Sequence, residues 1–370
     1  MFNFEIENKE VSSTKHQAVQ LSNEKQKHRQ AALKAWETIR RKHREQRTKG
    51  VEKLTRWMST DAMGKISHPE IIRPMDAEGW QGNGVVKLFN KTPEDIACGP
   101  FWELRWAYGC PLNCSYCYLR GTMRGRMKPS YVRIEETIRC IKEAFEHIQE
   151  PQIFNSGELC DSLMNPPLMA EIVDLFEMQD KHKIYLLSKF GTRNIGFLLE
   201  KPRKQTICGW SINPDVVARK WESVAAKPSD RIEAASLVWD EGYDTRIRID
   251  PIFPVPGWRE HYGELIDQII SMLLPNRIIL GTPRGLWKTI NYAKKAGVDI
   301  SWTKFFQENT GWGKKLSFEL RKDIYTFFYD KLISLNYPIH KISLCKETIK
   351  MWEVLGLQTK PKICNCYGRN

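Results

Sequence analysis

The stretch that decides the fold runs from Tyr108 to Leu119 and reads YGCPLNCSYCYL. It places Cys110, Cys114 and Cys117 at the spacing Cys-x3-Cys-x2-Cys, in a loop that follows a strand-like segment. Thiolates are soft ligands that select iron–sulfur clusters or zinc. Because the short spacing lets one loop wrap a compact inorganic core, we predict a metal centre here.

Two kinds of metal centre compete for this loop. A 4Fe–4S cluster held by three cysteines keeps one iron free of protein, and that iron can chelate the amino and carboxylate groups of S-adenosylmethionine. Electron transfer into the bound sulfonium would release a 5′-deoxyadenosyl radical. A structural zinc ion needs a fourth ligand, and the next candidate, Cys160, is distant in the sequence. The pattern favours the cluster and is the signature of the radical S-adenosylmethionine superfamily.

Short apolar runs alternate with helix-like stretches downstream of residue 101. This β-α alternation predicts an α/β fold, a parallel sheet with outer helices that is closed or partly closed as a barrel. Chemistry in such sheets lies at the carboxyl ends of the strands. The strand-like segments are 101–108, 152–155, 183–188, 206–212, 245–249 and 277–280, and the helix-like segments are 134–148, 167–179, 231–241, 261–274 and 286–296.

The N-terminal part differs in composition. Residues 14–49 are rich in Lys, Arg, Gln, Glu and Ala and contain no Gly or Pro. They predict a basic helix or an arm that becomes helical on a partner, with a solvated helix docked on the body as the alternative. We expect a basic N-terminal extension and linker over 1–83, the barrel over 84–300, and a substrate-contacting, cysteine-containing C-terminal segment over 301–370.

The formal net charge of the 370-residue chain is +13. Excess positive charge favours polyanions such as nucleic acid, although a merely soluble basic surface gives the same number. Apolar runs of transmembrane length and a signal-peptide pattern are both missing from the sequence. We therefore expect a cytoplasmic protein with reduced cysteines and no membrane partner.

Further segments, taken together, resemble the spore photoproduct lyase family, which repairs ultraviolet-induced thymine dimers in DNA. The resemblance spans roughly residues 101–315 and rests on the order and spacing of its pieces. These pieces are Cys-Ser-Tyr-Cys-Tyr-Leu at 114–119, Glu-Leu-Cys-Asp-Ser at 158–162, Ser-Lys-Phe at 188–190, Trp-Ser-Ile-Asn-Pro at 210–214, Gly-Tyr and Asp-Pro-Ile within 242–252, and Thr-Gly-Trp-Gly-Lys at 310–314.

The resemblance implies a partial (β/α)6 TIM-type barrel that holds a 4Fe–4S cluster and S-adenosylmethionine. It also implies DNA as the substrate, with RNA as an alternative, and a reductant such as flavodoxin or ferredoxin. The family has a cysteine after the second barrel strand that gives a hydrogen atom to the substrate radical, and Cys160 matches it. Tyrosines that flank the last cluster cysteine relay the radical in the family, and Tyr116 and Tyr118 match them.

The resemblance also implies a set of cofactor contacts. Ser156, Gly157 and Glu158 match the turn that binds the amino group of S-adenosylmethionine, because glycine lets a ligand approach and a carboxylate accepts from an ammonium. The remaining candidates follow strand ends, where ordinary capping is the alternative. They are Lys189 for the cofactor carboxylate, Ser211 and Asn213 for the ribose hydroxyls, and Arg246 and Arg248, which alternate on one strand and could point into the barrel toward an anion.

The family also carries a β-hairpin that wedges into the lesion. Its counterpart here is the segment 304–315, with Trp312, Lys314 and Lys315 as candidate wedge and phosphate contacts. The C-terminal cysteines Cys345, Cys364 and Cys366 could bind a second metal, line the mouth of the site, or remain reduced thiols in a packed tail.

Three hypotheses follow. The first is a lyase-type radical enzyme that cleaves a carbon–carbon bond in a DNA photoproduct. The second is a radical enzyme that modifies or rearranges a base in DNA or RNA. The third, which is not an enzyme, is a metal-bearing nucleic-acid-binding protein.

Overall fold

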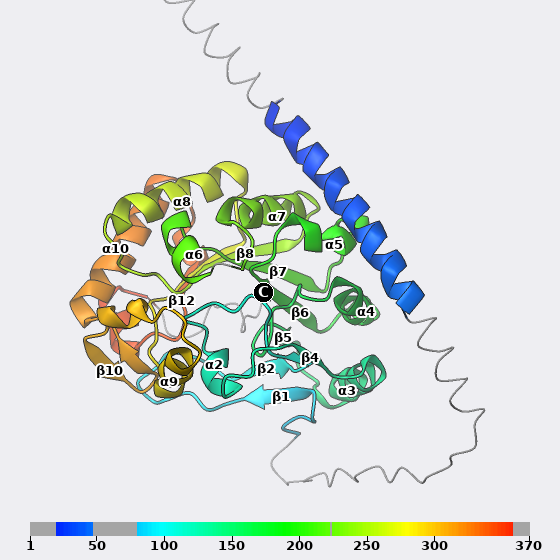
Figure 1. The fold of residues 1–370 in the computed structure, drawn as a ribbon, viewed down its shortest axis with the longest axis horizontal. Coiled ribbons are helices and arrows are strands. Elements are labelled where there is room, and N and C mark those ends of the chain that lie inside the picture. The colour runs from blue at the N-terminus through cyan, green and yellow to red at the C-terminus, as the bar shows by residue number, and fades with distance from the viewer. Residues whose placement is uncertain (1–19, 47–79, 223, 358–370) are drawn as a thin grey trace, which may run out of the picture.

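Six parallel strands form the framework of the structure (Figure 1). The computed structural model describes residues 20–46, 80–222 and 224–357. Within them, the strands that lie side by side in chain order are β2 (Phe101–Leu104), β5 (Ile153–Asn155), β6 (Lys183–Ser188), β7 (Thr206–Ser211), β8 (Asp244–Ile249) and β9 (Arg277–Leu280). Each is parallel to the next. The predicted partial (β/α)6 barrel is confirmed.

Two more strands extend this sheet at its edges. β1 (Val86–Phe89) pairs antiparallel with β2, and β12 (Ile342–Leu344) pairs parallel with β9. β12 belongs to the segment that we expected to follow the barrel. The sheet therefore continues beyond the boundary that the sequence suggested at residue 300.

A short contact joins the two edges of the sheet. The amide of Ala97 donates to the carbonyl of Glu347 at 2.8 Å, and the amide of Ile349 donates to the carbonyl of Asp95 at 2.9 Å. The first segment lies in the loop between β1 and β2, and the second follows β12. The ring of strands is therefore closed by this contact rather than by a full strand pair.

Helices cover the outer face of the sheet (Figure 1). In α3 (Ile134–His147) the buried residues are Thr137, Cys140, Ile141 and Ala144, whose spacing places them on one face. The strands beneath the helices are buried on both faces, as in β7, where all six residues are buried. The other helices are α4 (Pro166–Phe176), α5 (Gly196–Glu200), α6 (Asp215–Trp221), α7 (Pro228–Asp240), α8 (Trp258–Met272), α9 (Trp287–Lys295), α10 (Phe318–Ser334) and the short α2 (Leu119–Thr122) and α11 (Ile349–Val354).

The predicted elements agree with the observed ones at their centres and differ at some ends. β6 and β9 have the predicted bounds. The segment 101–108, predicted as one strand, divides into β2 and β3 (Ala107–Tyr108), which pairs with β4 (Ser130–Tyr131). The two parts have different partners, since β2 lies in the main sheet and β3 in a separate two-stranded sheet.

Residues 20–46 form one helix that packs on the barrel (Figure 1). Ala32 and Trp36 are buried, and Nε1 of Trp36 donates to the carboxylate of Glu200 at 3.1 Å. For these residues the docked helix, one of the two sequence alternatives, is what the structure shows. The rest of the basic stretch and most of the expected linker lie outside the described residues. Ion pairs around the contact are Lys25–Asp240, Arg29–Glu241 and Arg40–Glu200.

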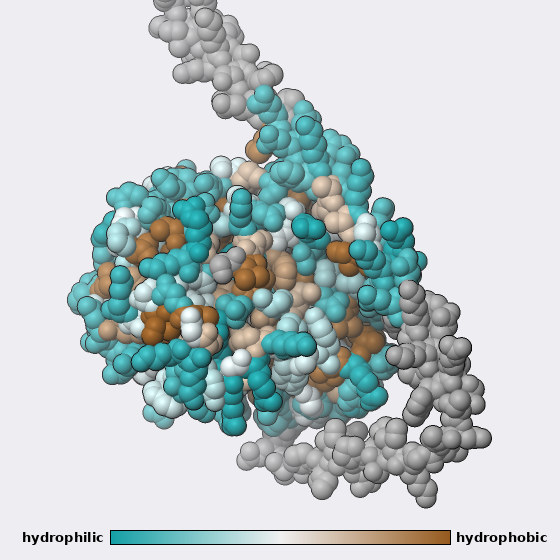
Figure 2. Space-filling view, in the orientation of Figure 1, coloured by the Kyte–Doolittle hydropathy of each residue, from teal (hydrophilic) through white to brown (hydrophobic). Residues whose placement is uncertain are grey.

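Figure 2 shows hydrophilic side chains over this helix and the outer helices, with apolar side chains gathered near the centre of the same face. Among the described residues, none of the helices has both the length and the apolar character that crossing a membrane requires.

Replacing Trp36 with Ala tests the docking of the N-terminal helix. Loss of a buried tryptophan should lower the free energy of unfolding by about 3 kcal/mol. Urea denaturation measures this change. The matched control is Glu37→Ala on the exposed face of the same helix, which should change stability by less than about 0.5 kcal/mol. Equal effects of the two variants would contradict the packing described above.

A buried histidine should make stability depend on pH. The His182 ring is fully buried and stacks on Phe145, with ring centroids 5.3 Å apart. Burial lowers the pKa of His182 to about 4. In the unfolded chain the ring takes up a proton near pH 6.5, so the free energy of unfolding should fall as pH drops from about 6.5 to about 4.

This contribution should amount to roughly 1–2 kcal/mol between pH 7 and pH 5. Urea denaturation at both pH values measures it in the wild type and in His182→Phe, which keeps an aromatic ring but cannot titrate. The variant should lose less stability than the wild type on acidification. Parallel losses would show that His182 does not cause the dependence.

Candidate active site

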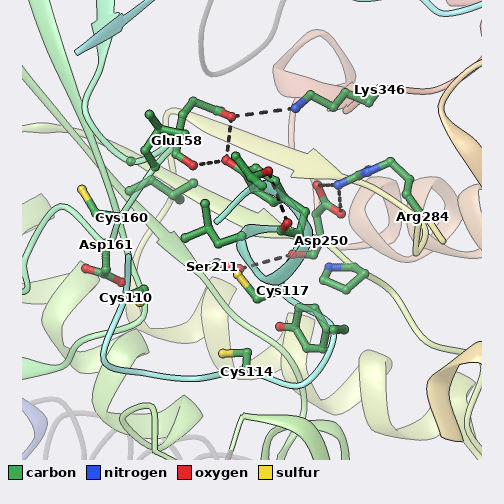
Figure 3. Close-up of a pocket in the computed structure, with 18 of the residues that line it drawn as sticks. Cys110, Cys114, Cys117, Glu158, Cys160, Asp161, Ser211, Asp250, Arg284 and Lys346 are labelled. Atoms are coloured by element: carbon green, nitrogen blue, oxygen red, sulfur yellow. Dashed lines mark hydrogen bonds and ion pairs between the residues drawn. The ribbon is translucent and has the colours of Figure 1, made fainter. Parts of the chain in front are cut away.

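A cavity of about 550 Å³ opens where the parallel strands end at their carboxyl edge. The ends of β2, β6, β7 and β8 and the cysteine loop contribute to its wall (Figure 3). The strand residues that line it include Glu103, Leu187, Ser188, Ser211 and Arg248, and the loop residues include Cys110, Cys114, Cys117, Gly157, Glu158, Cys160 and Lys189.

Local geometry holds the cysteine loop in a tight curve. Gly109 has φ +81°, and a Cβ there would lie 2.7 Å from the carbonyl of Lys128, so glycine is required. Within the loop, the buried Arg120 donates to the carbonyl of Cys114 at 3.1 Å and to that of Asn113 at 2.8 Å. The three cysteines are therefore presented by a backbone that is fixed at its start and at its centre.

The three thiols of the cysteine loop are brought to one site. All three line the cavity. Yet nowhere in the described part of the chain do three His, Cys, Asp or Glu side chains lie close enough to ligate one metal ion. Three thiols on one loop are the ligands that a 4Fe–4S cluster with one open iron would use, or a zinc ion that takes its fourth ligand from elsewhere.

Burial keeps these thiols protonated until a metal centre binds. It raises the pKa of Cys114 to about 12 and also raises the pKa values of Cys110 and Cys117. Positive side chains oppose this shift, with Lys189 acting on both Cys114 and Cys117. Because ligation needs thiolates, binding of the metal centre must release protons.

The turn after β5 brings a carboxylate to the cavity. Glu158 accepts from Nδ2 of Asn155 at 2.9 Å and from the hydroxyl of Tyr118 at 3.0 Å. Burial alone would raise its pKa, but the nearby charges of Lys346 and Arg248 hold that pKa below its ordinary value. An ionised carboxylate in this position can accept from the ammonium of a ligand.

Cys160 also faces the cavity. Its side chain is buried, and its Sγ donates to the carbonyl of Ser156 at 3.5 Å. Burial raises the pKa of the thiol well above its ordinary value, and the negative charge of Asp161 raises it further. Cys160 is therefore a neutral S–H group, the form that can give up a hydrogen atom.

The two tyrosines beside Cys117 hydrogen-bond to different carboxylates. The hydroxyl of Tyr116 donates to Glu222, and that of Tyr118 donates to the backbone and side chain of Glu158. Both tyrosines line the cavity. The structure thus places both tyrosines beside the cysteine loop, each with its hydroxyl held by a carboxylate.

A buried glutamate that the sequence did not single out orders one side of the cavity. Glu222 is fully buried and pairs with Arg231 at 2.6 Å and with Lys189 at 3.8 Å. Burial would raise its pKa, but Lys189 and Arg231 lower it to about 2. Lys189 in turn donates to Oγ of Ser211 at 2.5 Å, so the two predicted cofactor contacts are brought together. Nothing local in the sequence marks Glu222, since its partners are distant.

Three predicted cofactor contacts do not face the cavity. The hydroxyl of Ser156 is buried against that of Ser162 at 2.8 Å. Asn213 is fully buried and donates to Glu222 at 2.9 Å. Arg246 forms an ion pair with Asp244 deeper in the barrel, whereas Arg248, two residues closer to the strand end, lines the cavity. These side chains support the site but are not placed to contact a ligand in it.

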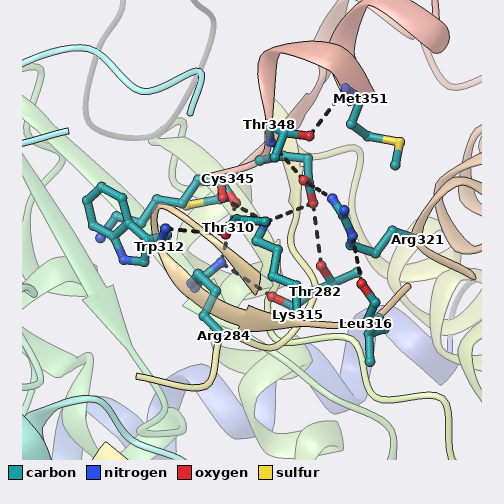
Figure 4. A network of polar contacts seen from close by, with 12 residues as sticks. Thr282, Arg284, Thr310, Trp312, Lys315, Leu316, Arg321, Cys345, Thr348 and Met351 are labelled. Carbon is teal, nitrogen blue, oxygen red and sulfur yellow. Dashed lines mark hydrogen bonds and ion pairs between the residues drawn. The ribbon is translucent and has the colours of Figure 1, made fainter. Parts of the chain in front are cut away.

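The expected hairpin is present. β10 (Glu308–Thr310) and β11 (Gly313–Lys315) pair antiparallel, and Trp312 at their turn lines the cavity. Lys314 is exposed on the hairpin. Lys315 is not a phosphate contact, because it is fully buried and its ammonium pairs with Glu347 at 3.0 Å (Figure 4).

The predicted C-terminal cysteine set cannot be assembled from the structure. Cys364 and Cys366 lie outside the described residues. Cys345 follows β12, and its Sγ accepts from Arg248 at 3.1 Å. This contact ties the end of β12 to the wall of the cavity.

Comparisons with known proteins find similarity to spore photoproduct lyases. A family model described as spore photoproduct lyase matches residues 100–279. The spore photoproduct lyase of Bacillus subtilis is 29% identical over 180 residues, which cover 46% of this chain and 52% of that protein. That of Clostridium acetobutylicum is 26% identical over 181 residues, with coverages of 46% and 52%. The chain thus spans about half the length of the curated relatives it matches.

Solved structures show the same fold. Spore photoproduct lyase complexed with dinucleoside spore photoproduct matches with a TM-score of 0.57 and 18% identity, over 71% of this chain and 80% of that chain. A mutant of that enzyme with bound AdoMet and dinucleoside spore photoproduct matches with a TM-score of 0.56 and 18% identity, over 70% of this chain and 78% of that chain. The chain is therefore similar in sequence to spore photoproduct lyases over residues 100–279 and similar in fold to solved structures of that enzyme.

Proposed function

We propose that this chain is a cytoplasmic radical S-adenosylmethionine enzyme that repairs the spore photoproduct, a thymine dimer, in DNA. The observation that carries the proposal is the meeting of three elements at one cavity. These are the three cysteines of one loop, the protonated thiol of Cys160, and the hairpin tip at Trp312. The substrate class comes from the relatives named spore photoproduct lyase.

The donor set fits the group that the family implies. Cys110, Cys114 and Cys117 would hold a 4Fe–4S cluster, and a reductant such as flavodoxin or ferredoxin would supply the electron. When bound, the cluster and S-adenosylmethionine together supply a 5′-deoxyadenosyl radical, which abstracts a hydrogen atom from the substrate.

The chain itself positions the cofactor by charge. Glu158 presents an ionised carboxylate to the cofactor ammonium, beside the open backbone of Gly157. Lys189 presents its ammonium to the cofactor carboxylate. Ser211, whose Oγ accepts from Lys189 at 2.5 Å, offers its hydroxyl group to a ribose hydroxyl of the cofactor. Arg248 adds a second positive charge to the wall.

Cys160 acts on the substrate after carbon–carbon cleavage. Its S–H bond breaks, a C–H bond forms on the carbon-centred product radical, and a thiyl radical remains on Cys160. Tyr116 and Tyr118 are further hydrogen-atom donors in the same cavity.

The substrate reaches the cavity by leaving the base stack, as bases do in other enzymes that act on them. In this proposal Trp312, at the hairpin turn, fills the gap in the duplex, and the exposed Lys314 contacts a phosphate. The net charge of +13 favours approach to DNA.

An anaerobic assay of the reconstituted protein with ultraviolet-damaged and undamaged DNA tests the proposal. Formation of 5′-deoxyadenosine and restoration of thymine should require the damaged DNA. Equal 5′-deoxyadenosine formation with both DNAs would instead favour modification or rearrangement of a base. If the reduced protein does not cleave S-adenosylmethionine at all, a nucleic-acid-binding protein without radical activity is the better description.

Replacing one cluster cysteine should remove the iron. In Cys114→Ala, anaerobic purification and reconstitution should leave the protein with most of its iron and sulfide lost, because three thiolates are needed to hold the cluster. Iron analysis and the absorption spectrum measure this. The control is Cys140→Ala, which removes a buried thiol from α3, away from the cavity, and should keep its iron. Equal iron content in both variants would contradict the assignment.

Replacing Cys160 should separate the first chemical step from the last. Cys160→Ala should still form 5′-deoxyadenosine, but thymine recovery should fall by at least about tenfold, a loss of roughly 1.4 kcal/mol in barrier lowering, and adducts should accumulate. Product analysis by mass spectrometry measures both. Cys208→Ala, which removes a buried thiol on β7, is the control. Unchanged recovery in Cys160→Ala would exclude Cys160 as the donor.

A further inference from the structure

A lysine ammonium lies among three aromatic rings at the rim of the cavity. Nζ of Lys346 is 4.9 Å from the ring centroid of Trp312, 5.8 Å from that of Tyr118 and 6.0 Å from that of Phe89. The rings come from the hairpin, the cysteine loop and β1, and all four residues line the cavity. Aromatic faces attract a cation and hold it in place.

This ammonium has unused hydrogen-bonding capacity. Its side chain is 14% exposed, and its ion pair with Glu158 spans 3.9 Å, which is too long for a hydrogen bond (Figure 3). Within the described residues, Nζ of Lys346 donates no hydrogen bond. An ammonium has three donors, and burying them without acceptors is unfavourable. The arrangement therefore suits an anionic ligand that enters from the cavity.

The backbone of Lys346 adopts an unusual conformation. Its φ of 52° lies in the left-handed region, which lysine rarely adopts. The carbonyl of Lys346 accepts from the buried Nζ of Lys315 at 3.0 Å. The next residue, Glu347, is held by Lys315 and Arg321 (Figure 4). A buried network thus maintains a strained residue at the site, and strain of this kind is found at functional positions.

Neighbouring arginines are already engaged. Arg248 and Arg284 both pair with Asp250, at 2.5 Å and 2.9 Å. Their charges add to the positive potential of this wall, but their guanidinium groups are directed to that carboxylate. Of Arg248, Arg284 and Lys346, Lys346 is the one whose charged group can turn to an incoming anion.

We propose that Lys346 binds a phosphodiester oxygen of the DNA strand that carries the lesion. The inference rests on the proposed function and adds a specific substrate contact to it. An anionic oxygen could also come from the carboxylate of the cofactor. The phosphodiester is favoured because Lys346 contacts the hairpin tip and lies across the cavity from Cys114 (Figure 3). Lys189, over the ring of Tyr116, is the lysine on the side of the cysteine loop.

Binding of two short single-stranded probes to the cluster-loaded full chain tests the inference. Both probes carry one spore photoproduct and a fluorescent label. One has the natural phosphodiester at the lesion, and the other has an uncharged methylphosphonate there. Fluorescence anisotropy gives the dissociation constant of each at several salt concentrations.

Lys346→Met should weaken binding of the phosphodiester probe about tenfold, as loss of a charge-assisted contact does. It should also reduce the slope of log affinity against log salt by about 0.7. Binding of the methylphosphonate probe should be unchanged. Lys346→Arg, which keeps the charge, should retain most of the preference for the phosphodiester.

Lys350→Met is the matched control. Lys350 is exposed, lies over the ring of Phe318 at 5.1 Å and does not line the cavity. Its replacement removes one positive charge four residues from Lys346, as Lys346→Met does, but not from the cavity wall. This variant should bind both probes as the wild type does. Thermal melting of each variant checks that it is folded.

The inference is overturned if Lys346→Met binds the phosphodiester probe as the wild type does, or if it weakens both probes equally. It is also overturned if the variant loses affinity only for S-adenosylmethionine, which would identify the cofactor carboxylate as the anion. These outcomes leave the proposed function standing. Failure of the wild type to prefer either lesion probe over an undamaged one would instead overturn both.

Discussion

Parallel pairing of the strands is the constraint on which the rest of the structure depends. When neighbouring strands run in the same direction, their carboxyl ends meet at one edge, and so do the loops that leave them. Cys160, Lys189 and Arg248 are far apart in the sequence, yet each follows or ends such a strand and lines the same cavity. The site is thus a consequence of topology before it is a consequence of any single contact.

Buried charge is the second condition that the fold must satisfy. The wall of the cavity carries more cations than carboxylates, and the buried carboxylates Glu222, Asp250 and Glu347 each pair with two cations. Pairing offsets the desolvation of each charge. The remaining positive potential suits a ligand that brings its own negative charge, as nucleic acid does.

Local patterns in the sequence were sufficient for much of this structure. The cysteine spacing and the β-α alternation, together with the resemblance to the spore photoproduct lyase family, predicted that the cluster loop, Glu158, Cys160, Lys189, Ser211 and Arg248 lie at one site, and all of them line the cavity. They could not predict how far along a strand the cavity extends. Alternation assigns Arg246 and Arg248 to the same face, yet only Arg248 lines the cavity. Nor could they show that Lys315, on a hairpin that otherwise fits the expectation, turns inward to Glu347.

Residues whose importance comes from distant partners escaped prediction for a related reason. Glu222 and Lys346 are ordinary charged residues in their local sequence. Their roles appear only when α6, β1, the hairpin and the segment after β12 are brought together. Such contacts depend on the path of the whole chain, and composition or spacing carries no record of them.

The late position of β12 in the chain has a consequence for synthesis. Until residues 342–349 leave the ribosome, the outer side of β9 has no partner, and the contact that joins Ala97 to Glu347 cannot form. An unpaired strand edge is a site of intermolecular association. Pairing of β12 with β9, together with the contact between Ala97 and Glu347, therefore covers a strand edge that would otherwise be open to other chains.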